Sequence, residues 1–425
     1  MRTATAAGVV LVIVCSLAAS PAKSSTDLTV SGQVRARAEF DDKAFGATVR
    51  SQSYTDLRSR LGVRAVVDSN TIAFVQIQDS RRLGGRDPFG NNTSGTLTNG
   101  VNVDVHQAYV QINHLWRDGP GLKAGRFEVN LANQRLFGSV GWSNVGRSWE
   151  GVTVWYERAH SRVEGLALKA REDNSNEGNT DSDIYGVTAS LPKLGITGFG
   201  FYEYDAKPAA TVLPAPPTTA TNLLDRFSAG FYLKRTVGRS DVELTAVYQL
   251  GSQAGVSAGE PPTYDIAAFM IAGEVGYTFD ASTAPRLAAG IDYASGDDDP
   301  SDDRIESYNN LYYTAHAFRG YMDYFVSSAS QGLLDGVLRG SLNPTAGWSV
   351  KADLHYFRTA VDYVDFQDRI TNEVGMELDL TVSTSRVAGV TITGGGSAFF
   401  PGESFAGIAD PETGLWGYLM VSADF

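Results

Sequence analysis

The chain has 425 residues, enough for a large globular core or one large barrel, with 45 glycines, 11% aromatic residues and a single cysteine. Its net charge of −13 argues against nucleic acid as a partner and against a polybasic membrane anchor. After the N-terminal region, no apolar stretch reaches the roughly 20 residues that a transmembrane helix needs. The rest of the chain is therefore either soluble or a β-barrel.

Residues 1–24 have the layout of a Sec signal peptide. Arg2 provides the positive end, residues 8–19 form the apolar segment, and cleavage fits after Ala22 or after Ser24. The alternative, an N-terminal anchor helix, would need a longer apolar run to cross a bilayer.

The only cysteine, Cys15, lies within this segment. Once the segment is removed, neither a disulfide nor a cysteine-ligated metal site can form. An exported chain that lacks cysteine and is rich in glycine and aromatic residues is typical of a Gram-negative outer-membrane protein. We expect residues 25–425 to form a single domain in that membrane.

Apolar residues alternate with polar or small residues along residues 25–425, as expected for strands with one face toward lipid and the other toward a lumen. A clear example alternates Glu377 and Asp379 with Leu378 and Leu380. The pattern predicts about 18 strands, an even number as single-chain bacterial barrels require. Their approximate ranges are 28–40, 55–67, 71–79, 103–115, 122–128, 150–157, 161–170, 182–190, 195–204, 225–236, 240–250, 265–279, 285–294, 334–342, 348–360, 372–382, 390–400 and 415–425.

The connections between these strands alternate in length. The odd ones are long, such as 80–102, 205–224 and 295–333, whereas the even ones are short turns such as 68–70 and 237–239. A barrel with both ends in the periplasm has this asymmetry between long extracellular loops and short periplasmic turns. A soluble β-sandwich has no reason to maintain it along the whole chain.

These observations predict an all-β fold, a transmembrane antiparallel β-barrel. In hydrocarbon every backbone N–H and C=O must be paired, so the sheet has to close. About 18 strands enclose a lumen too wide for wall side chains alone to fill. Water or inward-folded loops must therefore occupy it, and a passive pore is the expected function.

The last strand places Leu419, Val421, Ala423 and the terminal Phe425 on one face. A final strand ending in phenylalanine resembles the signal by which outer-membrane barrels are recognised for insertion, although an ordinary last strand is the alternative. We therefore expect the barrel-assembly machinery, outer-membrane lipid and lipopolysaccharide as partners. No cofactor is expected.

Basic residues gather on the inner face of the first two predicted strands. Arg35 and Arg37 share a face with Glu39, and the neighbouring strand carries three more arginines. A ladder of guanidinium groups in a water-filled pore would suit a polycarboxylate or another anion. The alternative is a lumen wall in which these cations only pair with inward acids, which lie mostly on later strands. The acids predicted to face inward are Glu39, Asp335, Asp353, Glu243, Glu274, Glu373, Glu377 and Asp379. The candidate pore-lining residues from the strands are Arg35, Arg37, Arg58, Arg60, Arg64, Arg126, Arg339 and Lys351.

Segment 295–333 is much longer than a turn requires and contains its own aromatic residues. We expect it to fold and to pack over or into the mouth of the barrel as a gate. Segment 206–221, rich in proline, alanine and threonine, is instead predicted to be an exposed loop. The acids of 297–303 lack the spacing of an EF-hand, so they are either solvated loop residues or a Ca²⁺ site.

Catalysis is not expected. The chain has five histidines and contains neither an HExxH nor a GxSxG motif. His316 is the only histidine in a predicted extracellular loop, and the sequence shows no partner for it.

Two segments resemble the alginate export family of outer-membrane barrels. The first runs from Leu122-Lys123-Ala124-Gly125-Arg126-Phe127 through Asn133-Gln134-Arg135-Leu136-Phe137-Gly138 to Trp142-Ser143-Asn144-Val145-Gly146-Arg147-Ser148-Trp149-Glu150-Gly151-Val152. Phe127 and Trp149-Glu150 depart from the family pattern, which has Gln and Phe-Asp at these places. The second is Ser295-Gly296-Asp297-Asp298-Asp299, followed by Tyr308, Tyr312 and His316-Ala317-Phe318-Arg319-Gly320-Tyr321-Met322-Asp323.

The resemblance implies an 18-stranded exporter with an arginine-lined lumen for an alginate-like polyuronate. It adds Arg135 and Arg147 to Arg126 as pore-lining candidates. The residues expected to gate the pore are Tyr308, Tyr312, His316, Phe318, Tyr321 and Asp323.

Two functions therefore remain open: export of an acidic polysaccharide, and uptake of small solutes by a substrate-specific porin. A third, a plugged structural or adhesive barrel, would conduct no ions.

Overall fold

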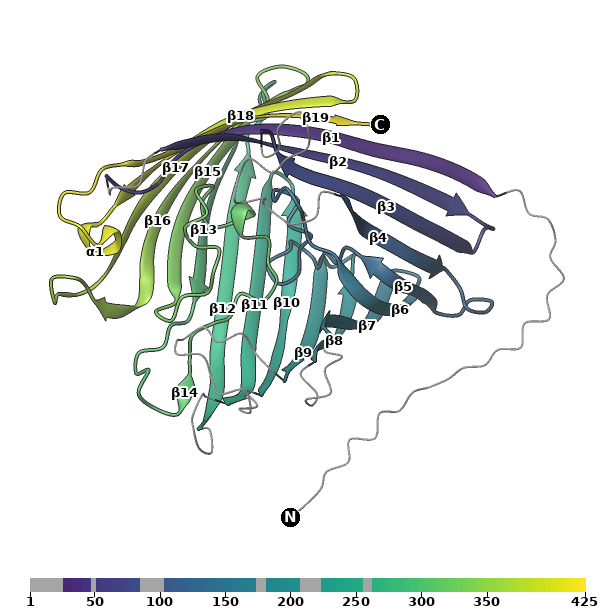
Figure 1. Cartoon of the computed structure of the whole chain (residues 1–425), viewed down its shortest axis with the longest axis horizontal. Coiled ribbons are helices and arrows are strands. Elements are labelled where there is room, and N and C mark those ends of the chain that lie inside the picture. The colour runs from purple at the N-terminus through teal and green to yellow at the C-terminus, as the bar shows by residue number, and fades with distance from the viewer. Residues whose placement is uncertain (1–25, 47–50, 85–102, 173–180, 207–222, 255–261) are drawn as a thin grey trace, which may run out of the picture.

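The computed structural model describes residues 26–46, 51–84, 103–172, 181–206, 223–254 and 262–425. The expected signal peptide, residues 1–24, lies outside this part of the chain. The described residues form a closed barrel of 18 antiparallel strands (Figure 1). Closure is made by β1 (Asp27–Asp42), which pairs with β2 (Gln52–Val66) on one side and with β19 (Gly414–Asp424) on the other.

Each of the remaining strands pairs with its neighbours along the chain. They are β3 (Thr71–Arg82), β4 (Val103–Ile112), β5 (Gly121–Phe127), β6 (Trp149–Arg158), β7 (Ser161–Arg171), β8 (Ser182–Leu191), β9 (Ile196–Asp205), β10 (Leu224–Val237), β11 (Ser240–Ala254), β12 (Thr263–Thr278), β13 (Arg286–Ala294), β15 (Leu333–Leu342), β16 (Trp348–Val364), β17 (Ile370–Val387) and β18 (Val390–Pro401).

The 18 strands correspond to the 18 predicted segments, so the fold prediction is confirmed. Short elements in the loops went unpredicted: β14 (Arg304–Ile305), which pairs in parallel with β12, the 3-10 turn η1 (Ala315–Ala317) and the helix α1 (Glu403–Ala406). Among the described residues, no helix is long and apolar enough to cross a bilayer.

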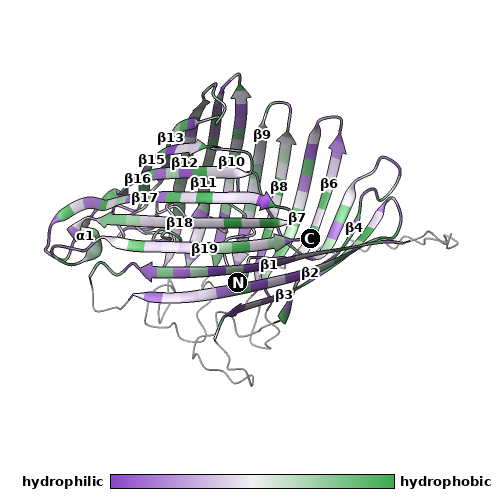
Figure 2. Cartoon of the chain, turned by 90° about the horizontal axis from the view of Figure 1, so that it is seen from above, coloured by the Kyte–Doolittle hydropathy of each residue, from purple (hydrophilic) through white to green (hydrophobic). Residues whose placement is uncertain are grey.

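The two faces of the wall differ in exposure as the alternation predicts. On β17, Leu378 and Leu380 are 47% and 50% exposed, whereas Glu377 and Asp379 between them are fully buried. Figure 2 shows the corresponding alternation of hydrophobic and hydrophilic residues along the strands. The apolar side chains form the lipid-facing surface, and the polar ones point inward.

A bulge near the loop end of β17 changes this alternation. The pairing of β16 with β17 shifts register between Phe357 and Arg358, next to Gly375, whose φ is +151°. Beyond the bulge, Val374 is buried and Glu373 is exposed. The expectation that Glu373 points inward is therefore wrong, because an extra residue in the ladder exchanges the two faces.

Replacing Leu378 by Arg places a charge on the lipid face at the middle of β17. We expect Leu378→Arg to lower the free energy of unfolding by about 2–4 kcal/mol. Lys351→Glu, a charge change at an exposed inward position, is the control and should change it by less than about 0.5 kcal/mol. Urea unfolding in lipid vesicles measures both, and equal losses would contradict the assignment of these two positions to different faces.

Candidate functional site

Two long loops fold back into the barrel and meet inside it. The first inward loop, residues 128–148, joins β5 to β6, and the second inward loop, residues 306–332, joins β14 to β15. Their backbones interlock: Tyr312 N–H donates to the Leu136 carbonyl at 2.9 Å, and Gly138 N–H donates to the Tyr312 carbonyl at 3.0 Å. A third bond runs from Thr314 N–H to Gln134, also at 3.0 Å. The prediction that 295–333 packs into the mouth is confirmed.

The first inward loop adopts a demanding backbone conformation. Ala132, Gln134 and Val140 have φ angles of +48°, +68° and +51°, which residues other than glycine rarely adopt. Such angles persist only where surrounding contacts hold them. The bonds to the second inward loop and to the barrel wall supply those contacts.

A single wall carboxylate binds both loops. Asp292 on β13 is 3% exposed and accepts hydrogen bonds from Arg135 of the first inward loop and from Arg319 of the second. Arg319 Nε lies 3.2 Å from the carboxylate, and its Nη1 donates to Asn310 at 3.0 Å. Burial on its own would lower the pKa of Arg319, but the neighbouring Asp292 raises it above its ordinary value. Arg319 therefore remains charged, and the carboxylate, which binds an arginine from each loop, holds the two loops together.

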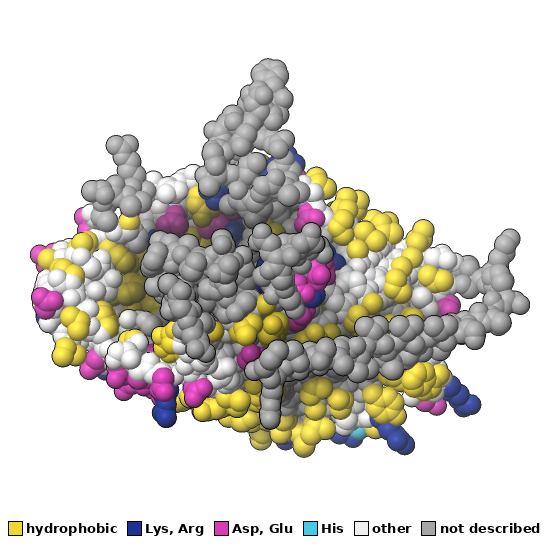
Figure 3. Space-filling view, turned by 60° about the horizontal axis from the view of Figure 1, so that its bottom comes forward, with side chains coloured by type: hydrophobic (Ala, Val, Ile, Leu, Met, Phe, Trp, Pro, Cys, Tyr) yellow, Lys and Arg dark blue, Asp and Glu magenta, His cyan; other side chains and the backbone are white. Residues whose placement is uncertain are grey.

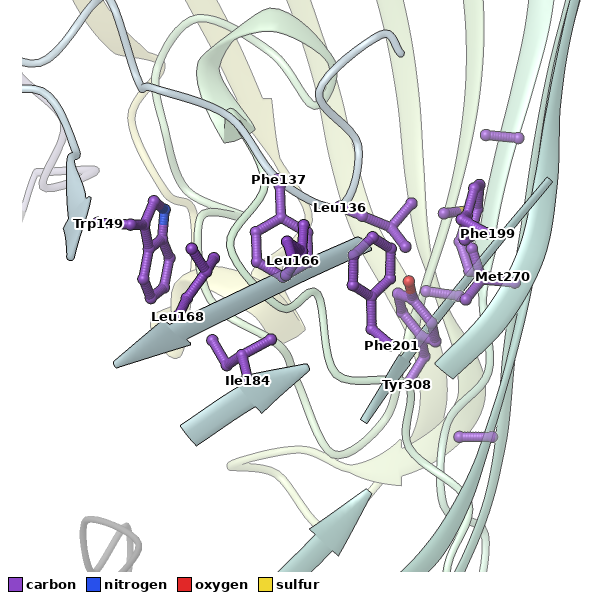
Figure 4. Packing of buried hydrophobic residues seen from close by; sticks show 14 of the residues in the cluster. Leu136, Phe137, Trp149, Leu166, Leu168, Ile184, Phe199, Phe201, Met270 and Tyr308 are labelled. Atoms are coloured by element: carbon purple, nitrogen blue, oxygen red, sulfur yellow. The ribbon is translucent and has the colours of Figure 1, made fainter. Parts of the chain in front are cut away.

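Apolar contacts hold the loops against the wall. Leu136, Phe137 and Tyr308 of the loops pack on inward side chains of strands between β5 and β13 (Figure 4). Met322 packs in a second cluster with side chains from β15 to β19. The wall residues of these two clusters are Phe127, Trp149, Leu166, Leu168, Ile184, Phe199, Phe201, Val247, Ala268, Met270, Ala272, Ala294, Leu333, Phe357, Val374, Phe399 and Trp416. The inner wall is apolar here because loops, not water, cover it.

The arginines of β1 and β2 point inward and contact the first inward loop. Arg35 donates to the carbonyls of Gly141, Trp142 and Ser143 at 2.7, 3.1 and 3.0 Å. Arg58 donates to the carbonyls of Gly141 and Ser143 and to the Gln33 side chain. Both arginines are 4% exposed, and within the described residues neither forms an ion pair with a carboxylate.

The other arginines of this wall have carboxylate partners or are exposed. Arg37 contacts Glu39 at 2.7 Å, and Arg60 contacts Glu128 at 3.3 Å. Arg64 is exposed on the same strand face as Arg60. The five arginines thus lie on one wall, as the strand pattern predicts.

The remaining strand candidates have three different environments. Arg339 lies 3.1 Å from Glu274 and 2.5 Å from Asp353, so it forms part of an ion-pair network. Lys351 is exposed and forms no ion pair among the described residues. Arg126 lies on the outer face, 3.0 Å from Glu150. Its predicted inward position is wrong.

The inward positions at the end of β5 explain this error. Phe127 is 1% exposed and packs among the apolar side chains inside the barrel, so the residue before it must point outward. Lys123 therefore shares the inner face with Phe127, and its ammonium group lies 5.3 Å from that ring.

The candidates taken from the family resemblance lie at the contact between the loops. Arg135 binds Asp292 and lies 4.0 Å above the ring of Phe318. Arg147 donates to the Tyr312 carbonyl and, at 3.3 Å, to that of Gly138. Burial lowers the pKa of Arg147.

The predicted gating residues are buried or partly buried in the second inward loop. Tyr312 donates to Glu203 at 2.8 Å, and Tyr308 is 2% exposed. His316 stacks between Trp142 and Tyr321, with ring centroids 4.1 and 5.1 Å away, and contacts Asp323 at 3.1 Å.

Two features of this site were missed from the sequence. The sequence pattern predicts only that Asp292 faces inward. It does not predict the contacts of Asp292 with Arg135 and Arg319, because these arginines lie 157 and 27 residues away in the chain. For the first inward loop, the sequence predicts a long connection over 129–149 that carries a family motif, but not that it packs inside the barrel. Its run of glycines and large aromatic residues, similar in kind to that of 295–333, could have indicated a packed loop.

In the described part of the chain, no three or more His, Cys, Asp or Glu side chains are grouped so that they could bind a metal ion. In the acidic segment 297–303, Asp299 accepts a hydrogen bond from the Ser301 hydroxyl at 2.5 Å. Asp302 accepts one from the backbone N–H of Arg304 at 2.7 Å.

Comparison with known proteins identifies the family. The sequence profile described as alginate export matches residues 26–413. The chain belongs to the alginate export family. Membership of this family, together with the closed barrel, identifies the chain as an outer-membrane pore. It is therefore a transport channel rather than an enzyme. No curated protein sequence matches it significantly.

Solved porins share the fold of this alginate export family member. A BenF-like porin from Pseudomonas fluorescens Pf-5 is 10% identical with a TM-score of 0.60, covering 94% of this chain and 98% of its own. OccK8 (OprE) of Pseudomonas aeruginosa is 11% identical with a TM-score of 0.56 and the same coverage. OpdK of Pseudomonas aeruginosa, solved with vanillate, is 9% identical with a TM-score of 0.57, covering 93% of this chain and 98% of its own. At these identities the likeness establishes the fold alone.

The double contact at Asp292 predicts how the loops can be released. Asp292→Asn leaves Arg135 and Arg319 buried without their counter-charge, and breaking a buried pair costs about 3–5 kcal/mol. We expect the loops to separate from the wall and single-channel conductance in planar bilayers to rise, with barrel insertion unchanged. Asp241→Asn is the control, because Asp241 binds Arg286 within the wall and touches neither loop. Equal conductance for Asp292→Asn and the parent chain would show that the loops do not close the pore.

Proposed function

We propose that this outer-membrane pore selects anionic, carboxylate-bearing solutes. The observation that carries the proposal is the pair Arg35 and Arg58, whose guanidinium charges are hydrogen-bonded to carbonyl oxygens and have no carboxylate partner among the described residues. Carbonyl dipoles stabilise a guanidinium without cancelling its charge. A positive potential therefore remains on the wall formed by β1 and β2.

Several inward acids, unlike these arginines, contact a basic side chain. Asp353 contacts Arg339 at 2.5 Å, and Asp335 contacts His355 at 2.9 Å. Glu377 is an exception, because it accepts the backbone N–H of Met322 beneath the second inward loop and has no cationic partner among the described residues. In Figure 3, acidic and basic side chains are visible in the hollow between the grey segments, whereas hydrophobic side chains cover much of the outer wall. The unpaired cations favour anion selectivity over the alternative of a fully salt-bridged wall.

Membership of the alginate export family supports an acidic polysaccharide as the solute and export as the direction. A polyanion moving along the β1–β2 wall would be attracted by this positive potential, and the exposed Arg64 could donate charge-assisted hydrogen bonds to it. In this proposal the second inward loop gates the path through Tyr308, Tyr312, His316, Phe318, Tyr321 and Asp323. Of these, Tyr312, His316 and Phe318 contact the first inward loop.

Uptake of small anionic solutes is the second candidate, and the interlocked loops are the observation that favours it. Two loops joined across the lumen leave less width for a polymer than for a small molecule. The similarly folded OpdK was solved with vanillate, a small carboxylate, which also favours uptake of small anionic solutes.

Ion selectivity tests the proposal directly. Replacing Arg35 and Arg58 together by Gln removes the charges of these two arginines while keeping side chains that can donate to loop carbonyls. We expect the reversal potential in a KCl gradient at about 0.1 M, where screening acts over about 10 Å, to shift toward cations. Oligouronates should then block the current less.

The matched control is Arg126→Gln, which removes one positive charge from the outer face and should leave selectivity unchanged. A parent pore that prefers cations would refute the proposed anion selectivity. An anion-selective pore that oligouronates do not block, but small carboxylates do, would favour uptake over polysaccharide export.

A further inference from the structure

A small cavity lies where the arginine-bearing wall meets both inward loops. Its volume is about 310 Å³, and β1, β2, β3, β19 and the two loops all contribute to its lining. We refer to it as the Trp142 cavity, because Trp142 of the first inward loop and Asp323 of the second lie on its lining together with Arg82 of β3. The strand residues that line it lie toward the extracellular ends of their strands.

Each cation of the Trp142 cavity lies over an aromatic ring. The Arg37 guanidinium is 3.9 Å from the centre of the Trp142 ring, and the Arg82 guanidinium is 3.7 Å from that of Tyr54. The Lys43 ammonium lies 5.4 Å from the centre of the Trp416 ring. Cation–π contact fixes the positions of these charges before any solute arrives.

Glu39 organises the cavity, and both of its carboxylate oxygens already accept hydrogen bonds from the protein. Its two carboxylate oxygens accept hydrogen bonds from Arg37 at 2.7 Å, from the Tyr54 hydroxyl at 3.1 Å and from the Trp416 indole at 3.1 Å. It therefore holds two of the aromatic rings and neutralises Arg37.

Arg82 and Lys43 keep donors available. Arg82 uses its Nε to contact Asp56 at 3.2 Å, and its terminal nitrogens form no hydrogen bond within the described residues. The Lys43 ammonium lies 3.5 Å from Asp41. The side chains of Arg82 and Lys43 are 29% and 23% exposed. The terminal nitrogens of Arg82 can bind a carboxylate through two parallel hydrogen bonds.

The size and polarity of the cavity limit what could bind there. A volume of about 310 Å³ is near the lower end for ligand sites, which suits a molecule of about one sugar ring. Asp56, Ser143, Asn144 and Asp323 on the lining carry oxygen atoms that can accept hydrogen bonds from hydroxyl groups.

We propose that the Trp142 cavity binds a hydroxylated carboxylate of one sugar ring's size, with its carboxylate on Arg82 and Lys43. This inference rests on the proposed anion selectivity and assigns it a specific binding site. Because both inward loops line the cavity, a bound solute contacts wall and loops together. The same chemistry occurs in a free uronic acid and in one residue of an acidic polysaccharide.

Calorimetric titration of the full barrel in detergent with sodium glucuronate tests the site. Arg82→Gln should weaken glucuronate binding about tenfold, the value of one charge-assisted contact. Arg81→Gln is the matched control, since Arg81 is the adjacent residue on the opposite strand face, 2.6 Å from Asp79. It should leave affinity unchanged. Arg82→Lys keeps the charge beside Asp56 but loses the planar fork, so it should fold and bind with intermediate affinity.

Equal affinity of the parent, Arg82→Gln and Arg82→Lys chains for glucuronate would overturn the site, as would equal binding of neutral glucose. A glucuronate affinity equal to that of an oligouronate supports a free small acid as the ligand. Much tighter binding of the oligomer supports a polysaccharide residue at the same site. The reversal potential of the parent pore is measured separately, so an anion-selective pore that fails to bind glucuronate refutes this site and leaves the proposed function standing.

Discussion

Closure of the sheet between β1 and β19 is the constraint on which the rest of the structure depends. In a bilayer an unpaired strand edge would leave backbone groups without hydrogen-bond partners, and the ten paired positions from Gln33–Asp424 to Asp42–Leu415 remove that edge. Closing 18 strands fixes a wide lumen, which side chains of the wall cannot fill. The two inward loops follow from that width, since they occupy space that would otherwise hold only water.

Holding two long loops inside a barrel has a large cost in conformational entropy. Three kinds of contact offset it here: backbone bonds between the loops, apolar packing on the inner wall, and the buried Asp292 carboxylate with its two arginines. The apolar packing is non-directional, whereas the Asp292 contact specifies which loop residues meet. A buried ionic contact of this kind is costly to break from one side, which gives the loops a defined position.

Ion pairs also fix most charges in the lumen. The carboxylate partners of Arg37 and Arg339 belong to the wall, and the partner of Arg60 belongs to the first inward loop. Arg35 and Arg58 instead bind loop carbonyls, so they contribute to holding the first inward loop and leave a positive potential. If the pore is anion-selective as proposed, loop position and selectivity are linked, because the same guanidinium groups serve both.

The sequence by itself determined the number of strands, their inward and outward faces and the alternation of loops with turns, since a period of two and the need for apolar lipid contact act locally. It also placed Arg35, Arg37, Arg58, Arg60 and Arg64 on one wall, because neighbouring strands follow each other in the chain. Only the tertiary structure decided what those arginines contact. The exchanged face at Glu373 depends on a register shift, and the outward position of Arg126 depends on the packing of Phe127 inside the barrel. The contact at Asp292 and the Trp142 cavity depend on loops that meet across the lumen. Such contacts join residues far apart in the chain, and no local pattern encodes them.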